Sequence, residues 1–286
     1  MSKPKMGIFV IAVSLLATQC GVARAAGVSA ASAGASGASV KGLLRTGGGQ
    51  DRLARAVLEG SEKDGRVRRG GGAVVRVGSV EELVGAVEEV GDGGTILIAD
   101  GRYRLAGPII LREKKDVTIR SASGDAERVV LMGRGWDSGD LHDDILRIGH
   151  CDGVTISDLT FADCRSYGVK VEAENGPRNV HILRCRFRDI GVRAIKGSAG
   201  QDPNVRAVRG SVRHCGFENT KVPPADWLFG GDYISAIDMM ALEDWTFSDN
   251  VFRNIKGRNG GARAAIFIWV RSRGVTVERN RMVGCD

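Results

Sequence analysis

The chain has 286 residues, enough for one large domain with a sizeable core. Hydrophobic residues make up 43% and charged residues 26%, which excludes a disordered chain, and the lone long apolar run at the N-terminus excludes a polytopic membrane protein. With 41 glycines, 6 prolines and 5% aromatic residues, the composition favours tight turns and small β-branched core residues over a helical bundle.

The first 25 residues have the layout of a signal peptide. Lys3 and Lys5 form a basic segment, residues 7–16 an apolar run too short to span a bilayer, and residues 23–25 an Ala-Arg-Ala cleavage site. Lipidation at Cys20 is a weaker alternative, because Thr-Gln is a poor lead-in to a lipidated cysteine. We expect a protein that is secreted, periplasmic or at the cell surface, with no transmembrane segment in the mature chain.

Cleavage of this segment changes the charge and cysteine counts. It removes three of the 41 basic residues, so 38 remain against 34 acidic residues, a mild excess that does not predict binding to nucleic acid. Five cysteines remain, and an odd number cannot all pair within one chain. No cysteine or histidine has zinc spacing, so we expect buried thiols that pack as small hydrophobic groups.

Residues 26–72 are rich in Ala, Ser and Gly and are predicted to form a flexible leader, with a folded domain over residues 73–286. Ser79 to Glu82 form a capping box, and one helical face follows at Val80, Leu83, Val84 and Val87. Residues 91–94, Gly-Asp-Gly-Gly, end this helix, and a strand begins at residue 95. A lone amphipathic helix before a series of strands is predicted to cover the end of a β-rich domain.

An internal repeat runs through the second half of the chain. Its template is a short alternating strand, a tight turn and a second short strand that ends in Phe or Met. Five segments fit the template: 154–161, 180–187, 210–217, 245–252 and 275–282. The turn of each segment shares one column, which advances by 26, 30, 35 and 30 residues: Leu159, Cys185, Cys215, Asn250 and Asn280.

A further strand with period-two alternation recurs between these segments, at 146–148, 169–171, 195–197, 237–239 and 266–268. One such coil cannot bury its inner face alone, whereas coils stacked ~4.8 Å apart share a continuous core. The sequence therefore predicts an all-β, right-handed parallel β-helix with an N-terminal capping helix. Leucine-rich repeats fit less well, because they need shorter repeats and more leucine.

The turn column predicts a ladder along the stack. Asn250 and Asn280 are expected to hydrogen-bond between coils, with Cys185 and Cys215 in the same column where the ladder is apolar. The alternative is that asparagine simply favours turns. The last repeat ends at residues 285–286, where the next long strand should begin, and a solenoid needs a polar cap. We therefore expect the chain to be a fragment of a longer β-helix.

These features resemble a known superfamily. The helix at residues 79–90, the strand segment Gly94 to Tyr103 and the segment Val117 to Gly124 look like the N-terminal coils of the pectate-lyase-like superfamily. The repeats resemble its parallel β-helix repeat, and the resemblance covers about residues 73–286. Polysaccharide lyases such as chondroitinase B and alginate lyases are similar in layout. Their catalytic motifs are not intact here, so the resemblance implies the fold and assigns no catalytic residue.

Alternation along the long strands predicts which side chains point outward. The first outward column is Arg147, Lys170, Lys196, Asp238 and Phe267, and the second is Gly149, Glu172, Ser198, Met240 and Trp269. Three cations one coil apart repel each other by roughly 1 kcal/mol per neighbouring pair at a wet surface. Glu172 and solvent relieve this repulsion if the face is an ordinary charged one. Otherwise the cations meet an acidic ligand.

Two long loops, residues 198–209 and 218–234, flank these columns, and the second carries Trp227 and Phe229. These aromatic side chains either fold back onto the domain or wall a groove, where a ring beside cations suits a sugar chain that carries carboxylates or sulfates. We predict an acidic polysaccharide as the partner. The expected substrate-binding residues are Arg147, Lys170, Glu172, Trp227 and Trp269.

Two functions stay open. The first is a lyase that cleaves an acidic polysaccharide by β-elimination, with Lys196 as the base and Lys170 lowering its pKa. Asp238 would orient Lys196, or act as the acid in a hydrolase, although an aspartate beside a lysine favours the charged lysine. The alternative is a non-catalytic surface β-helix that binds glycans or serves a structural role.

No cofactor is predicted. Calcium is a secondary expectation from four carboxylates in turns, Asp143, Asp144, Asp158 and Asp163.

Overall fold

The computed structural model describes residues 72–139 and 142–286. The predicted signal peptide and almost all of the predicted leader lie outside the described residues. A short strand, β1 (Val74–Val77), comes before the helix and was not predicted, whereas the series of strands after the helix was predicted. Among the described residues, none of the helices is both long enough and apolar enough to cross a bilayer.

The helix α2 (Val80–Glu89) is capped at both ends. The Oγ of Ser79 accepts a hydrogen bond from the backbone N–H of Glu82 at 3.1 Å, as in a capping box. The Glu82 carboxylate, however, accepts from the N–H of Gly78 at 2.7 Å, one residue before the expected donor. At the other end, Lys114 Nζ donates to the carbonyls of Glu88 and Val90 at 2.8 Å, where a cation complements the helix dipole.

The buried face of α2 consists of Leu83, Ala86 and Val87. The prediction that Val84 shares this face is wrong, because its side chain is 40% exposed. Residue 84 is rotated by about 100° from Leu83, and the apolar stripe instead follows the i, i+3, i+4 spacing from Leu83. The buried face belongs to the same core as the strands that follow, so the helix covers the first coils.

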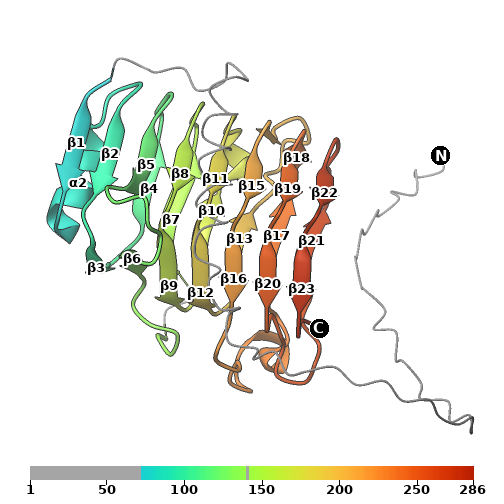
Figure 1. The fold of residues 1–286 in the computed structure, drawn as a ribbon. Helices are drawn as coiled ribbons and strands as arrows, with labels where there is room; N and C mark the ends of the chain where they lie inside the picture. The colour runs from blue at the N-terminus through green and yellow to red at the C-terminus, as the bar shows by residue number, and fades with distance from the viewer. Residues whose placement is uncertain (1–71, 140–141) are drawn as a thin grey trace, which may run out of the picture. The chain divides into compact units, whose positions relative to one another are not determined.

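The strands form three parallel sheets whose neighbours come from successive coils (Figure 1). The first sheet contains, in spatial order, β1 (Val74–Val77), β2 (Thr95–Ile98), β5 (Thr118–Ser121), β8 (Thr155–Ser157), β11 (His181–Leu183), β15 (Ser211–Arg213), β19 (Thr246–Ser248) and β22 (Thr276–Glu278). The second contains β3 (Gly101–Arg104), β6 (Val129–Met132), β9 (Thr160–Cys164), β12 (Arg186–Ile190), β16 (Gly216–Glu218), β20 (Val251–Arg253) and β23 (Arg281–Val283).

The third sheet carries the long strands with the outward columns. It contains β4 (Ile109–Arg112), β7 (Asp144–Gly149), β10 (Tyr167–Val171), β13 (Arg193–Gly197), β17 (Ser235–Met240) and β21 (Ala264–Trp269). The remaining elements are the pair β14 (Ala207–Val208) and β18 (Leu242–Glu243), and the 3₁₀ turns η1 (Ala173–Asn175) and η2 (Leu228–Gly231). The fold is thus the predicted all-β, right-handed parallel β-helix.

Inside the coils, equivalent residues stack on one another. Phe161, Phe187, Phe217 and Phe252 form a continuous phenylalanine stack, with ring centroids 5.1, 4.8 and 4.7 Å apart. These are the residues that end four of the five repeat segments, and their strands pair in the register that the repeat predicts. Side chains in the stack are almost fully buried and hold neighbouring coils together through apolar burial and ring contact.

The turn column forms the predicted ladder. Asn250 is fully buried, and its Nδ2 donates to Asn280 Oδ1 at 2.9 Å and to the Val212 carbonyl at 3.0 Å. Its Oδ1 accepts from the backbone N–H of Cys215 at 2.9 Å. Cys185 and Cys215 are also buried, and burial raises the pKa of the Cys215 thiol to about 12, so both pack as inert hydrophobic groups.

The residue before each column position has a positive φ, between 50° and 59°, which closes the turn tightly: Asp158, Arg184, His214, Asp249 and Arg279. Such a conformation is uncommon for residues other than glycine, although aspartate tolerates it better than most. Two neighbouring pairs in this set, Asp158–Arg184 and Asp249–Arg279, form ion pairs between coils at 2.6 and 2.7 Å. The turn is therefore held by a polar ladder inside and by ion pairs outside.

The ladder gives a first testable result. Asn250→Ala should lower the free energy of unfolding by about 1–3 kcal/mol, because the substitution removes the side-chain partner of two buried backbone groups in the preceding coil, the Cys215 N–H and the Val212 carbonyl. Chemical denaturation measures this change, and Asn204→Ala, in an exposed loop, serves as the matched control. Equal stability of the two variants would show that the buried amide contributes nothing.

Candidate functional site

The first outward column stacks in register across the third sheet, as predicted. Lys170 pairs with Arg147 on one side and Lys196 on the other, and Asp238 follows Lys196. Phe267 pairs with Asp238 on the last of these strands. We call these five residues the strip. The strip is less exposed than alternation alone suggests, because Lys196 and Asp238 are buried, while the other three side chains are half-buried.

Asp238 is the centre of a hydrogen-bond network that joins three coils. Its Oδ2 accepts from Arg193 Nε at 2.6 Å, and its Oδ1 lies 3.1 Å from Lys196 Nζ. The indole Nε1 of Trp269 donates to the same Oδ1 at 3.0 Å. Strands β13, β17 and β21 therefore each contribute to a carboxylate with no exposed surface.

The network shifts the pKa of both central groups downward. Burial alone would raise the pKa of Asp238, but the adjacent Lys196 and Arg193 cations outweigh it and lower the pKa below the ordinary aspartate value. For Lys196, burial is the largest effect and lowers the pKa, while Asp238 opposes it. The neighbouring cations Arg193 and Lys170 lower the pKa of Lys196 further. The sequence predicts the lowered pKa from Lys170, whose effect is smaller than that of burial.

Arg193 is the member of the network that sequence reasoning missed. It is 1% exposed, and its Nη1 donates to the carbonyls of Val192 at 2.7 Å and Tyr233 at 2.5 Å. Its guanidinium also lies 4.0 Å from the centroid of the Tyr233 ring. Arg193 stands two residues before the inward Ile195, so strict alternation places it in the core. An arginine at an inward position of a strand was the available signal, since buried arginines need partners.

The outer cations of the strip have carboxylate partners too. Arg147 Nη2 lies 2.7 Å from Asp144, and Lys170 Nζ lies 3.7 Å from Glu174. Burial raises the pKa of Asp144 despite the opposing Arg147. Each of the three cations in the strip therefore already pairs with a carboxylate. Arg147 and Lys170 remain partly accessible, with side chains 24% and 20% exposed.

Glu172 follows Lys170 by two residues in the same coil but does not face solvent. It is 3% exposed, and its carboxylate accepts from Arg112 Nη2 at 2.9 Å and from Asn175 Nδ2 at 2.8 Å. The carboxylate therefore neutralises Arg112 from two coils earlier rather than the cations of the strip.

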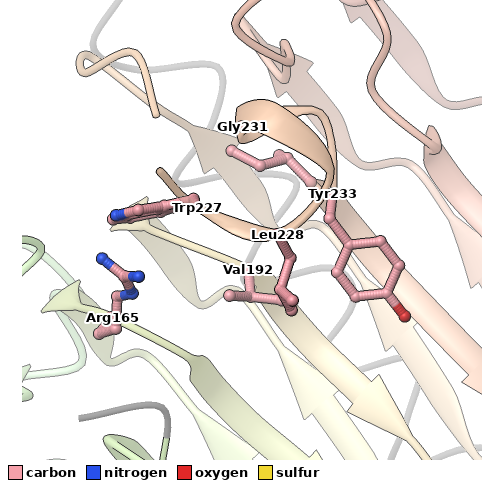
Figure 2. Close-up of a pocket in the computed structure, with 7 residues that line it drawn as sticks. Arg165, Val192, Trp227, Leu228, Gly231 and Tyr233 are labelled. Atoms are coloured by element: carbon pink, nitrogen blue, oxygen red, sulfur yellow. The ribbon is translucent and has the colours of Figure 1, made fainter. Parts of the chain in front are cut away.

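Trp227 packs against the body of the β-helix beside a small pocket (Figure 2). It is 7% exposed, its ring lies 5.0 Å from that of Trp136, and the Arg165 guanidinium lies 3.6 Å over it. The pocket is lined by Arg165, Val192, Trp227, Leu228, Gly231, Tyr233 and Ile234. Of the two placements predicted for Trp227, the structure has the one in which the ring folds back onto the domain. Trp269 instead stays half-buried at the end of the strip and stacks on Phe267 at 5.2 Å.

The four carboxylates considered for calcium do not gather. Across residues 72–139 and 142–286, no three histidine, cysteine or acidic side chains form a group that could hold a metal ion. Asp144 and Asp158 pair with arginines, and Asp163 lies 3.0 Å from Arg104. Asp143 accepts from backbone N–H groups, including that of Arg165 at 2.9 Å.

Comparisons with known proteins show what the fold is similar to. No protein-family model and no curated protein sequence matches the chain. Among solved structures, an alginate lyase from Paenibacillus sp. str. FPU-7 is 14% identical, with 74% of each chain covered and a TM-score of 0.46. A putative glycosyl hydrolase from Parabacteroides merdae is 16% identical, with 72% of this chain and 91% of that chain covered and a TM-score of 0.49.

The PL6 family alginate lyase AlyGC is 13% identical with a TM-score of 0.50, and the match covers 76% of this chain and 29% of AlyGC. The chain thus spans less than a third of that enzyme. At such identities the likeness concerns the fold alone, which is a parallel β-helix.

Proposed function

We propose that this protein is a secreted, carbohydrate-active β-helix protein, a lyase that cleaves an acidic polysaccharide by β-elimination. The observation that carries the proposal is the environment of Lys196. Burial lowers the pKa of this lysine within a row of cations, and a buried aspartate fixes its position. A lysine that loses its proton more readily than usual is suited to work as a base.

The elimination needs three operations: neutralising the uronate carboxylate, removing the proton on the carbon beside it, and protonating the departing glycosidic oxygen. Arg147 and Lys170 would bind the carboxylate, with arginine suited to bidentate contact. Both side chains are partly accessible, and the salt bridges they now make, with Asp144 and Glu174, could be shared with a substrate carboxylate.

Lys196 would remove the proton as its neutral amine. The electron pair of the broken C–H bond then forms the C=C bond as the glycosidic C–O bond breaks, and the protonated Lys196 can return its proton to the departing oxygen. Asp238 would orient the amine through the 3.1 Å contact, and Trp269 would keep the carboxylate in place. Trp269 and its stacking partner Phe267 offer ring faces at the end of the strip.

A second candidate function rests on the same contact. Asp238 favours the charged form of Lys196, which opposes its work as a base. If Lys196 stays charged when a polymer is bound, it cannot act as a base. The strip is then a binding surface, and the protein is a non-catalytic β-helix that binds acidic glycans.

Incubation of the purified protein with alginate, polygalacturonate and chondroitin sulfate separates the two functions. The lyase should release unsaturated sugar ends, seen as growing ultraviolet absorbance, from at least one polymer, and dextran serves as the uncharged control. Binding of an acidic polymer that never yields unsaturated ends would establish the second function and exclude the first.

A further inference from the structure

The loop before β17 presents a large aromatic ring to solvent. Phe229 is 67% exposed, although apolar side chains of this size are usually withdrawn from water. Its backbone is in the left-handed region, with φ 55° and ψ 38°, which is strained for a bulky residue. A strained and exposed aromatic residue that the core does not need is a reason to look for a ligand.

Two further side chains complete a platform around this ring. The Tyr233 ring lies 5.1 Å from that of Phe229, and the Arg263 guanidinium lies 5.2 Å from the centroid of each ring. Arg263 is itself exposed. We call Phe229, Tyr233 and Arg263 the aromatic platform, which combines apolar ring faces with one accessible cation.

The loop that carries Phe229 and Tyr233 is fixed by the next coil. The Asp232 carboxylate accepts from the backbone N–H of Asn259 at 2.8 Å and from its Nδ2 at 3.1 Å. The Arg258 N–H donates to the Gly231 carbonyl at 3.1 Å. Gly231 has φ 88°, and a Cβ there would come within 2.8 Å of the Pro224 carbonyl oxygen, so only glycine fits this turn. Phe229 is therefore held in place before any ligand arrives, which reduces the entropy lost on binding.

Tyr233 connects the platform to the centre of the strip. Its other neighbour is Arg193, whose guanidinium lies over the Tyr233 ring at 4.0 Å and bonds to Asp238 at 2.6 Å. A single guanidinium group thus separates the platform from the network around Lys196. A polymer that occupies the strip and continues toward the start of β17 would meet the platform next.

We infer that the aromatic platform is a subsite for an acidic sugar unit next to the one held at the strip. The C–H face of the sugar ring would stack on Phe229, and Arg263 would pair with the sugar carboxylate. This inference rests on the proposed acidic polysaccharide ligand and not on the chemical step. It also replaces Trp227, whose buried ring belongs to the packing of the loop, as the aromatic residue of the sugar site.

Titration calorimetry with alginate oligomers of increasing length tests the subsite. Phe229→Ala should weaken binding of long oligomers on the order of tenfold, as expected from loss of a ring beside a cation, and should leave unchanged the binding of oligomers too short to leave the strip. Phe229→Tyr should keep most of the affinity. Val222→Ala serves as the matched control, because Val222 lies in the same loop and is 62% exposed.

The outcomes separate the subsite from the lyase. If Phe229→Ala binds every oligomer as the wild type does while the wild type releases unsaturated ends, the subsite is wrong and the lyase stands. If Phe229→Ala weakens binding but no unsaturated ends form, the subsite stands and the lyase is wrong. Melting temperatures of the two alanine variants should equal that of the wild type, since both side chains lie outside the core.

Discussion

Lys196→Ala should lower the turnover of an acidic polysaccharide by about 10²–10⁴-fold, the range that a positioned acid–base group contributes. Lys196→Arg is the sharper comparison, because it keeps a cation in the strip and cannot supply a neutral amine at working pH. On the lyase proposal both variants lose turnover, and the arginine variant keeps most of its polymer affinity. Release of unsaturated ends and calorimetric binding are measured on the same preparations.

The pH profile adds a readout that a purely structural role would not produce. Because the neutral amine is the active form, kcat/KM should rise with pH through the folded-state pKa of Lys196, which burial places below the ordinary lysine value. A variant that retains wild-type turnover without Lys196 would remove this lysine from the mechanism. If the wild type never cleaves the polymer and Lys196→Ala only weakens its binding, the second function, a non-catalytic β-helix that binds acidic glycans, is supported.

Asp238→Ala should lower the free energy of unfolding by about 3–5 kcal/mol, more than the loss expected for Asn250→Ala. The substitution leaves the guanidinium of Arg193, which is 1% exposed, without its closest counter-charge. Asp249→Ala is the matched control, because its partner Arg279 lies on the surface and solvent can replace the lost contact. Denaturant unfolding of the two variants should show a large loss for Asp238 and a small one for Asp249.

The same carboxylate predicts a direction with pH. The folded-state pKa of Asp238 lies below its unfolded value, so its contribution to stability is complete above the unfolded value and disappears as the pH falls through the folded pKa.

Replacing both members of the ion pair, as Arg193→Met with Asp238→Leu, should recover much of the stability lost in Asp238→Ala, since buried ion pairs often yield little net stability over apolar groups. A double variant as unstable as Asp238→Ala alone would contradict the ion-pair explanation.

The repeat made most of the fold predictable. Equivalent residues of successive coils must stack, so a column such as Cys215 and Asn250 appears as a regular spacing and fixes the register of the strands on either side. The same register predicts that Lys196 and Asp238 are neighbours on adjacent strands, and they are. Periodicity reports on backbone stacking and on neighbours in a column, because both repeat from one coil to the next.

Features that do not repeat were not predictable in this way. Arg193 lies three residues before Lys196, the strip residue of the same strand, yet its side chain bonds to Asp238. Alternation predicts which residues point inward, but it does not predict this contact with a strip residue of the next coil. Trp227 and Phe229 are two residues apart in one loop, yet the first is 7% and the second 67% exposed. The difference in exposure depends on the conformation of the loop, which Asp232 fixes by bonding to the following coil and Gly231 fixes through its positive φ. These contacts occur once and leave no repeating pattern in the sequence.

The network around Asp238 draws Arg193, Asp238 and Trp269 from three successive coils, and each coil of a solenoid is stabilised only by its neighbours. Local opening of such a structure proceeds coil by coil, with free energies below that of complete unfolding. If the coil that contains β21 opens, Trp269 and Phe267 leave the site, while the phenylalanine stack from Phe161 to Phe217 stays assembled. The proposed activity therefore depends on the least stable of three adjoining coils, and heating should abolish it while most of the β-structure persists.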